Sequence, residues 1–260
     1  MTGIYDEPEM YELACAYRDV RGEVDALERW YARHTGRDDG PGQVLELAAG
    51  PAEHSLELSR RGPHTIALDL SGAMCARARD KAARDGLRLD VVQADMRDFS
   101  LPQPVDLAIT MLNSVCHLMS LDDLVAHLRA VSRAVAPGGL YVMELAHPAD
   151  FLTLVSRTSS EWDSEVGTSQ VHVRWGGGED VIDPVTQVTR EHVQVTVRDG
   201  AGVRTLADVV ANRFWTGTEV VAAVRLADGF HEVACYGDFA DGVSVADREA
   251  WRMIFVFQRV

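Results

Sequence analysis

The sequence predicts an α/β protein with a doubly wound, mostly parallel sheet and an antiparallel β insertion. Three observations support this: short apolar runs alternate with helical patterns up to Pro148, a two-residue alternation follows, and a helix and two strands end the chain. Strands that alternate with helices at such spacing form parallel βαβ units. Alternating apolar and polar residues are typical of antiparallel strands with one solvated face.

The first half contains the signals for the parallel sheet. Residues 5–34 have apolar and aromatic positions at helical spacing, which predicts one or two N-terminal helices. Ser71 and Ser120 stand where helix N-caps belong, and Gly62 and the turn at 137–139 stand where helices end. Five short apolar runs predict the strands: 44–49, 64–70, 87–95, 105–111 and 140–146.

The second half changes character beyond Pro148. Three alternating segments predict antiparallel strands: 168–176, 186–197 and 204–214. Thr216 and Glu219 form a capping box for a helix over 220–229. The last two strands are expected at 230–239 and 251–260.

Composition narrows the class of protein. A net charge of -15 and no long basic block exclude a nucleic acid partner by electrostatic repulsion. An acidic N-terminus and no apolar run of 18 residues predict a cytoplasmic protein without a membrane span. Four widely separated cysteines predict neither a disulfide framework nor a metal site.

The first strand-to-helix turn, ELAAGPA, bears on the ligand. A dinucleotide site needs a G-x-G-x-x-G turn whose free amides hold the pyrophosphate. Here only Gly50 is present, and Pro51 removes an amide. The turn therefore suits close approach of a flat ligand without phosphates, and a nicotinamide oxidoreductase is the least favoured reading.

Two further strand ends carry acids. Asp69 follows Gly50 by 19 residues at the end of the second strand, where a carboxylate can accept both ribose hydroxyls. Asp95 and Met96 close the third strand, where an acid can accept an adenine amino proton and a thioether can pack on the ring. Together with the turn they describe an adenosine, which fits S-adenosylmethionine better than NAD.

At this point the chain resembles the class I S-adenosylmethionine-dependent methyltransferases over about residues 40–148. The resemblance lies in five motifs in order, VLELAAG, ALDLS, QADMRDF, VDLAITMLNSVCHL and APGGLYVMEL. The N-terminal DEPEMYELACAYRDVRGEVDAL and the antiparallel lobe narrow it to a small-molecule branch that includes sugar N,N-dimethyltransferases and glycine N-methyltransferase-like enzymes.

The sequence pattern and the resemblance together divide the chain into four expected regions. Residues 1–40 would be an N-terminal helical lid, and residues 41–150 the Rossmann-like cofactor-binding core. An antiparallel β insertion would span 151–215 and serve as an acceptor roof or a dimer surface. The last helix and final strands of the core would occupy 216–260.

The resemblance also implies a cofactor site for S-adenosyl-L-methionine. Gly50 and Ala48 would contact its methionine end, Asp69 its ribose, and Asp95 and Met96 its adenine. The full set of expected cofactor-binding residues is Tyr11, Arg18, Glu46, Ala48, Gly50, Asp69, Leu70, Asp95, Met96, Met111 and Asn113. For Arg18 a clamp on the methionine carboxylate and an ion pair with the protein's own acids are equally open.

Methyl transfer from a sulfonium is an in-line displacement that depends mainly on alignment, but an amine or hydroxyl acceptor also has to lose a proton. His117 follows the fourth strand and is the candidate base, with a structural histidine bonded to backbone as the alternative. Tyr17 is the second candidate catalytic residue. Ser114, His147 and Tyr236 are the expected substrate-binding residues, although strand aromatics are usually core.

We therefore predict an S-adenosylmethionine-dependent methyltransferase that acts on the nitrogen or oxygen of a small acceptor, such as a natural product or amino sugar. The alternatives are an enzyme of the same fold with a non-methylating reaction and a non-enzymatic cofactor-binding protein. The sequence leaves a monomer and a homodimer open.

Overall fold

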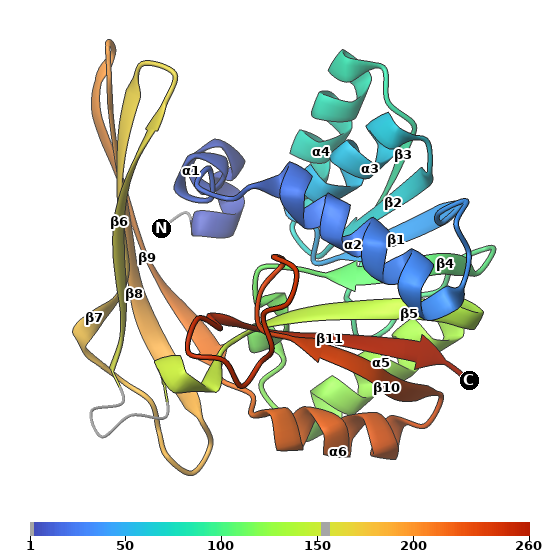
Figure 1. Cartoon of the computed structure of the whole chain (residues 1–260). Helices are drawn as coiled ribbons and strands as arrows, with labels where there is room; N and C mark the ends of the chain where they lie inside the picture. Colours follow the sequence, from blue (N-terminus) through green and yellow to red (C-terminus); the bar gives the residue numbers. More distant parts are fainter. Residues whose placement is uncertain (1–2, 152–156) are drawn as a thin grey trace.

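The computed structural model describes residues 3–151 and 157–260, and these form two sheets (Figure 1). The larger sheet has the strand order β10-β11-β5-β4-β1-β2-β3. Its strands are β1 (Gln43–Leu47), β2 (His64–Asp69), β3 (Leu89–Gln93), β4 (Val105–Thr110), β5 (Val135–Ala146), β10 (Phe230–Tyr236) and β11 (Arg252–Arg259). Strands β1 to β5 pair in parallel, and β11 runs antiparallel to both β5 and β10. The predicted fold class, including the separate antiparallel sheet, is confirmed.

Helices cover both faces of this sheet, as a doubly wound fold requires. On one face lie α2 (Val20–Thr35), α3 (Glu53–Arg61) and α4 (Gly72–Asp85), and on the other α5 (Leu121–Ala134) and α6 (Gly217–Ala227) (Figure 1). The strand order reverses between β1 and β4. Ligands of such sheets bind beyond the carboxyl ends of the strands at this reversal.

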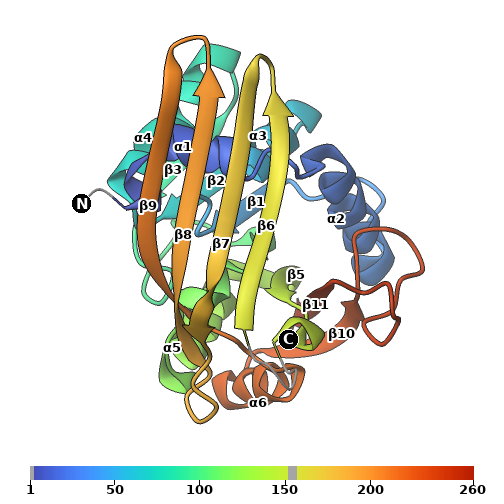
Figure 2. The same cartoon turned by 90° about the vertical axis from the view of Figure 1, so that its left-hand side faces the viewer.

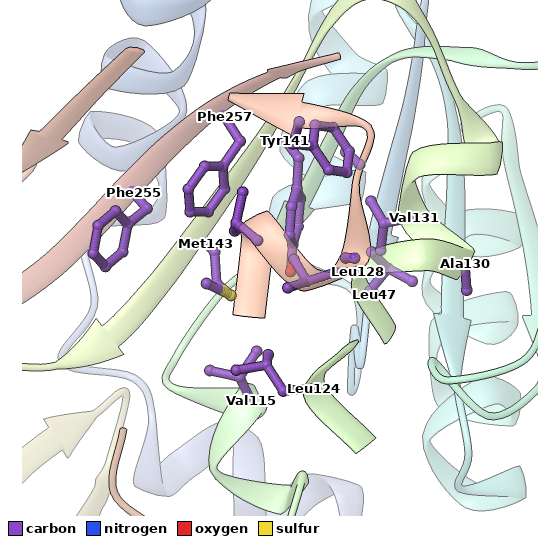
Figure 3. Packing of buried hydrophobic residues seen from close by; sticks show 14 of the residues in the cluster. Leu47, Val115, Leu124, Leu128, Ala130, Val131, Tyr141, Met143, Phe255 and Phe257 are labelled. Atoms are coloured by element: carbon purple, nitrogen blue, oxygen red, sulfur yellow. The ribbon is translucent and has the colours of Figure 1, made fainter. Parts of the chain in front are cut away.

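The core explains why the strands read as continuous apolar runs. Leu47 of β1 packs with Tyr141 and Met143 of β5 and with Leu128 of α5, as Figure 3 shows from close by. Val44, on the opposite face of β1, packs in a second buried cluster with α2. A strand buried on both faces has no polar face, so its sequence shows little alternation.

Helix caps lie where the sequence predicts them. The side chains of Ser71 and Ser120 accept hydrogen bonds from the backbone N–H of Met74 and Asp123 at the starts of α4 and α5. Thr216 forms the complete capping box with α6. These caps satisfy amides that have no partner inside the helix.

The second sheet has the order β6-β7-β8-β9, with bounds β6 (Arg157–Val166), β7 (Ser169–Val181), β8 (Val188–Asp199) and β9 (Gly202–Arg213). Figure 2 shows its outer face toward the viewer, with α1 (Pro8–Ala14) behind it. The inner face carries a row of valines that includes Val173 and Val195, and these bury Ile4, Met10 and Ala14. The short helix η1 (Ile4–Asp6) and α1 therefore lie between the insertion and the large sheet (Figure 1).

The structure differs from the prediction in two elements. Strand β6 was not predicted, because its acids at 161, 163 and 165 leave few apolar residues to show the alternation. The helix α5 ends at Ala134 rather than at the turn 137–139, because β5 already begins at Val135 and contains that turn. Two further short helices, η2 (Ser114–His117) and η3 (Pro148–Asp150), follow β4 and β5.

None of the helices in the described ranges combines the length and the apolar character that a bilayer span needs.

Candidate active site

The turn after β1 has a strained backbone. Ala48, Gly50 and Ala52 all have positive φ angles, of 49°, 54° and 62°. Glycine adopts this region freely, whereas an alanine there is strained by roughly 1–3 kcal/mol. Backbone strain held in place by the fold is typical of ligand sites. Two more positive φ angles, at Leu112 and Asn113, follow the neighbouring strand β4.

A cavity of about 260 Å³ opens between these two strained turns. It lies at the reversal of strand order, between the ends of β1 and β4, under the N-terminal segment. Six of the predicted site residues line it: Tyr11, Arg18, Glu46, Ala48, Met111 and Ser114. The structure thus brings these six residues together at one cavity, next to the turn after β1.

Asp69 stands beside the turn at the end of β2. Its carboxylate accepts hydrogen bonds from the backbone N–H of Gly50 at 2.7 Å and of Ser71 at 2.8 Å. Burial raises its pKa, and these two amides oppose that rise. The next side chain, Leu70, is 68% exposed, which leaves an apolar surface next to the carboxylate.

Asp95 and Met96 follow β3, the strand at one edge of the large sheet. The Asp95 carboxylate is held by the Arg97 guanidinium, at 2.7 Å from Nη2, and this hydrogen bond lowers its pKa. The Met96 carbonyl accepts a hydrogen bond from buried His127, whose pKa burial lowers to about 4. The other ring nitrogen of His127 is hydrogen-bonded to the Tyr141 hydroxyl. A neutral His127 therefore ties the segment at Met96 to β5.

Arg18 is buried and paired with acids of the protein itself. Its two terminal nitrogens donate to the two carboxylate oxygens of Glu144 at 2.8 and 2.9 Å, and its Nε lies 2.6 Å from Glu23. Burial would raise the pKa of Glu144, but the charge and hydrogen bonds of Arg18 lower it to about 2. Of the two roles expected for Arg18, the structure contains the ion pair.

Glu46 faces the start of α3. Its carboxylate accepts from the backbone N–H of Ser55 at 2.8 Å, and its other oxygen lies 3.2 Å from His54 Nδ1. The second ring nitrogen of His54 lies 2.7 Å from Glu23. Glu46 is therefore fixed by α3 and, through His54, by α2.

Tyr11 lines the cavity, and Asn113 stands beside it, between the lining residues Leu112 and Ser114. The Tyr11 ring lies over the turn, 3.6 Å from where a Cβ on Gly50 would stand. Asn113 accepts a hydrogen bond from the backbone N–H of Ala146 and so ties the loop after β4 to the end of β5. Ser114 donates to the Met111 carbonyl at 2.7 Å.

His117, the candidate base, forms a pair with Tyr5 one layer beyond Tyr11. Its Nε2 lies 3.0 Å from the Tyr5 hydroxyl, and burial lowers its pKa, opposed by a hydrogen bond to the backbone of Ala211. Burial raises the pKa of Tyr5 well above its ordinary value. A neutral imidazole that donates to a carbonyl must accept at its other nitrogen, so the Tyr5 hydroxyl donates to Nε2.

Ten of the sixteen predicted site residues do not line the cavity. Besides Gly50, Asp69, Leu70, Asp95, Met96, Asn113 and His117, these are Tyr17, His147 and Tyr236. Tyr17 is 46% exposed and packs edge-on against Trp162 of β6. His147 caps η3, and its Nε2 lies 2.9 Å from the Val245 carbonyl. Tyr236 stacks on Trp30 of α2 at 4.5 Å.

Sequence reasoning missed Tyr5, Glu23, His54 and Glu144. Tyr5 and His54 lie outside the quoted motifs, whereas Glu23 and Glu144 lie within two of them. None was singled out, because each makes its contacts here with a partner distant in sequence. No group of three or more His, Cys, Asp or Glu side chains that could hold a metal ion occurs among the described residues.

The residues present fit S-adenosylmethionine. Its ammonium and sulfonium suit a cavity that carries carboxylates of Glu12, Glu46 and Glu53 on its wall. The Tyr11 ring would stand 3.6 Å from a Cβ at Gly50, so Tyr11 lies next to the turn and could cover a ligand bound there. Asp69 and the exposed Leu70 would hold the ribose and pack on the adenosine.

The chain is similar to known proteins across the core and beyond it. A family model described as a methyltransferase domain matches residues 44–139. The dTDP-3-amino-3,4,6-trideoxy-alpha-D-glucopyranose N,N-dimethyltransferase of Streptomyces venezuelae is 30% identical over 188 residues, which cover 71% of this chain and 73% of that protein.

Solved structures share the whole fold. Streptomyces venezuelae DesVI has a TM-score of 0.80 at 23% identity, over 97% of this chain and 98% of its own. The S-adenosylmethionine-bound CalS10, an amino pentose methyltransferase from Micromonospora echinaspora, has a TM-score of 0.73 at 24% identity, over 95% and 96%. Both the sheet order and the relatives lead to one conclusion: this chain belongs to the class I S-adenosylmethionine-dependent methyltransferases and uses S-adenosylmethionine as its cofactor.

Proposed function

We propose that this methyltransferase transfers the methyl group to an amine nitrogen of a small acceptor, of the amino sugar type. The Tyr5–His117 pair is the observation that carries the proton transfer, because an acceptor must lose a proton to this base. The relatives named above, which include an amino sugar N,N-dimethyltransferase and an amino pentose methyltransferase, support the acceptor class.

An amine must lose a proton before its lone pair can attack, because an aliphatic ammonium is the main form at neutral pH. When bound, S-adenosylmethionine supplies an electrophilic methyl carbon and a neutral thioether as leaving group. In our proposal the Tyr5 hydroxyl passes its proton to Nε2 of neutral His117 and takes one from the acceptor ammonium. The nitrogen lone pair is then free, and His117 holds the proton as an imidazolium.

In the proposal, the remaining site residues position the cofactor and the acceptor and enclose them. Tyr11, Met111 and Ser114 would line the path between the methyl and the acceptor, and Asp69 would hold the ribose. The Asp95 carboxylate, held by Arg97, would accept a hydrogen bond from the adenine amino group, and Met96 would pack on the ring. Tyr17, His147 and Tyr236 would then act only through the outer part of the acceptor site.

Mass spectrometry of reactions with matched acceptors tests the proposal. An amino sugar and its hydroxyl analogue are each incubated with enzyme and S-adenosylmethionine. We expect one or two methyl groups on the amine and none on the analogue. Methylation of the hydroxyl compound alone would overturn the choice of nitrogen.

The role of His117 can be separated from cofactor binding. We expect His117→Asn to lower kcat by roughly a hundredfold, because a positioned base contributes at least that factor, while the Kd for S-adenosylhomocysteine stays unchanged. His172→Asn is the matched control, since His172 alternates along β7 with the buried Val171 and Val173 and pairs with exposed Asp163. A kcat for His117→Asn equal to that of the control would contradict the role of base.

A further inference from the structure

We propose that His54 is a positioning residue for the cofactor: held as an imidazolium between Glu23 of α2 and Glu46 of β1, it fixes the carboxylate of Glu46 at the cavity wall. This inference rests on the cofactor site of the family and is independent of the proposed acceptor. His54 lines the cavity. The proposed role does not need His54 to touch the methyl group or the acceptor.

The charge of His54 follows from geometry. Its two ring nitrogens lie 2.7 Å from Glu23 Oε2 and 3.2 Å from Glu46 Oε1. A neutral imidazole has one N–H and could donate to only one of two carboxylates, so both contacts require the doubly protonated ring. The side chains of all three residues are at most 7% exposed, so water is not available to replace a lost contact.

His54 is one member of a continuous buried chain of alternating charge. From Glu46 the chain passes through His54, Glu23, Arg18 and Glu144, each ion within 3.2 Å of the next, oppositely charged one. Arg252 of β11 ends it, with Nε 2.9 Å from Glu144. The three carboxylates and three cations cancel, and loss of the His54 charge would leave one buried carboxylate unbalanced.

This chain joins the parts of the molecule that enclose the methionine end. It connects β1 and α3 on one wall to the segment before α2 and to β5 and β11 on the other. Glu46, His54 and Arg18 each reach the cavity. The nearby Glu12 and Glu53 are paired with Lys81 rather than with His54, so Glu23 and Glu46 are its charge partners.

The contact with His54 determines how the Glu46 carboxylate is oriented when a ligand binds. A carboxylate with fixed oxygens can accept from an ammonium without reorganising, whereas an unpaired one turns toward the nearest donor. His54 therefore acts on binding of the amino acid end and leaves the alignment of acceptor and methyl to other residues. Its removal should raise the Kd for the cofactor more than it lowers kcat.

Calorimetry with S-adenosylhomocysteine tests the proposal on the full chain. His54→Gln should raise the Kd about tenfold or more, since truncation of one partner leaves a buried charge unpaired, while kcat at saturating cofactor changes by less than about threefold. His64→Gln is the control, because His64 lies on the neighbouring strand and pairs with exposed Asp90. A His54→Gln protein that is folded and binds as tightly as the control overturns the proposal.

A charge-balanced double variant separates charge from shape. Glu23→Gln combined with His54→Gln removes one anion and one cation, and we expect it to bind S-adenosylhomocysteine more tightly than His54→Gln alone. A double variant that binds no more tightly than the single one contradicts the charge argument.

A measurement on the unaltered protein covers the case in which the variants do not fold. The ¹⁵N chemical shifts of the His54 ring should show two N–H groups up to about pH 8 and should move when S-adenosylhomocysteine is added. A neutral ring under these conditions overturns the proposal.

Discussion

At the scale of single residues, the charge of His54 gives the fold a pH dependence that can be measured. Burial alone would lower the pKa of His54, but its hydrogen bonds to Glu23 and Glu46 outweigh burial and raise the pKa from 6.5 to about 9. A group whose pKa is raised by folding contributes stability that is complete below its unfolded pKa and is lost as the pH rises through its folded pKa.

We expect unfolding free energies to show this loss. Wild type should lose roughly 3 kcal/mol relative to His54→Gln between about pH 6 and about pH 10, as the difference between the two pKa values requires. Urea denaturation at a series of pH values measures it. Parallel curves for the two proteins across this range would contradict a charged His54.

The residues that the sequence identified and those it missed differ in one physical respect. The roles that we propose for Asp69 and the turn at Gly50 depend on their own backbone position, at the end of a strand, which local sequence specifies. His54 and Glu23 have their role only because α2 and α3 pack together, over a separation of 31 residues. The pattern of a single sequence does not show which distant helices pack together, so it cannot predict such a contact.

At the scale of elements, ion pairs tie the helix α1 to the core. Glu12 accepts from Arg77 Nη2 at 2.6 Å and from Lys81 at 2.7 Å, both on α4. The opposite side of α1 packs on the valines of the insertion. The helix is seven residues long, and one so short is not stable alone, so these contacts decide how firmly it covers the cavity.

Removal of this tie should loosen the helix. We expect Glu12→Gln to speed amide hydrogen exchange in residues 8–14 by about tenfold, because local opening then breaks fewer contacts. Glu9→Gln is the control, since the Glu9 carboxylate is 66% exposed and lies 3.4 Å from Arg77. Equal protection of α1 in both variants would show that the apolar contacts hold it alone.

The elements also show where sequence patterns suffice. Strands β1 and β4 were predicted because burial on both faces forces apolar runs, and the caps at Ser71 and Ser120 were predicted because an N-cap is a local hydrogen bond. Strand β6 is held by its pairing with β7, from the pair Arg157–Val181 to the pair Val166–Ser169. Pairing uses backbone groups, which leave no trace in side-chain composition.

At the scale of the whole molecule, the N-terminal segment lies between the two sheets and covers the cavity at the strand ends. The large sheet presents its strand ends, the insertion presents an apolar face, and η1 and α1 fill the space between them (Figures 1 and 2). The division into lid, core and insertion that we infer for function follows this arrangement. The sequence could indicate each part, but the placement of the insertion against α1 depends on tertiary packing.

Calorimetric titration of S-adenosylhomocysteine into Asp69→Ala tests the central claim most directly. The account predicts a Kd raised by roughly tenfold to a hundredfold relative to wild type, because the carboxylate would accept charged hydrogen bonds from the ribose. Asp90→Ala, an exposed change on the adjacent strand, should bind like wild type. An Asp69→Ala protein that is folded and binds as tightly as Asp90→Ala would contradict the placement of the cofactor at these strand ends.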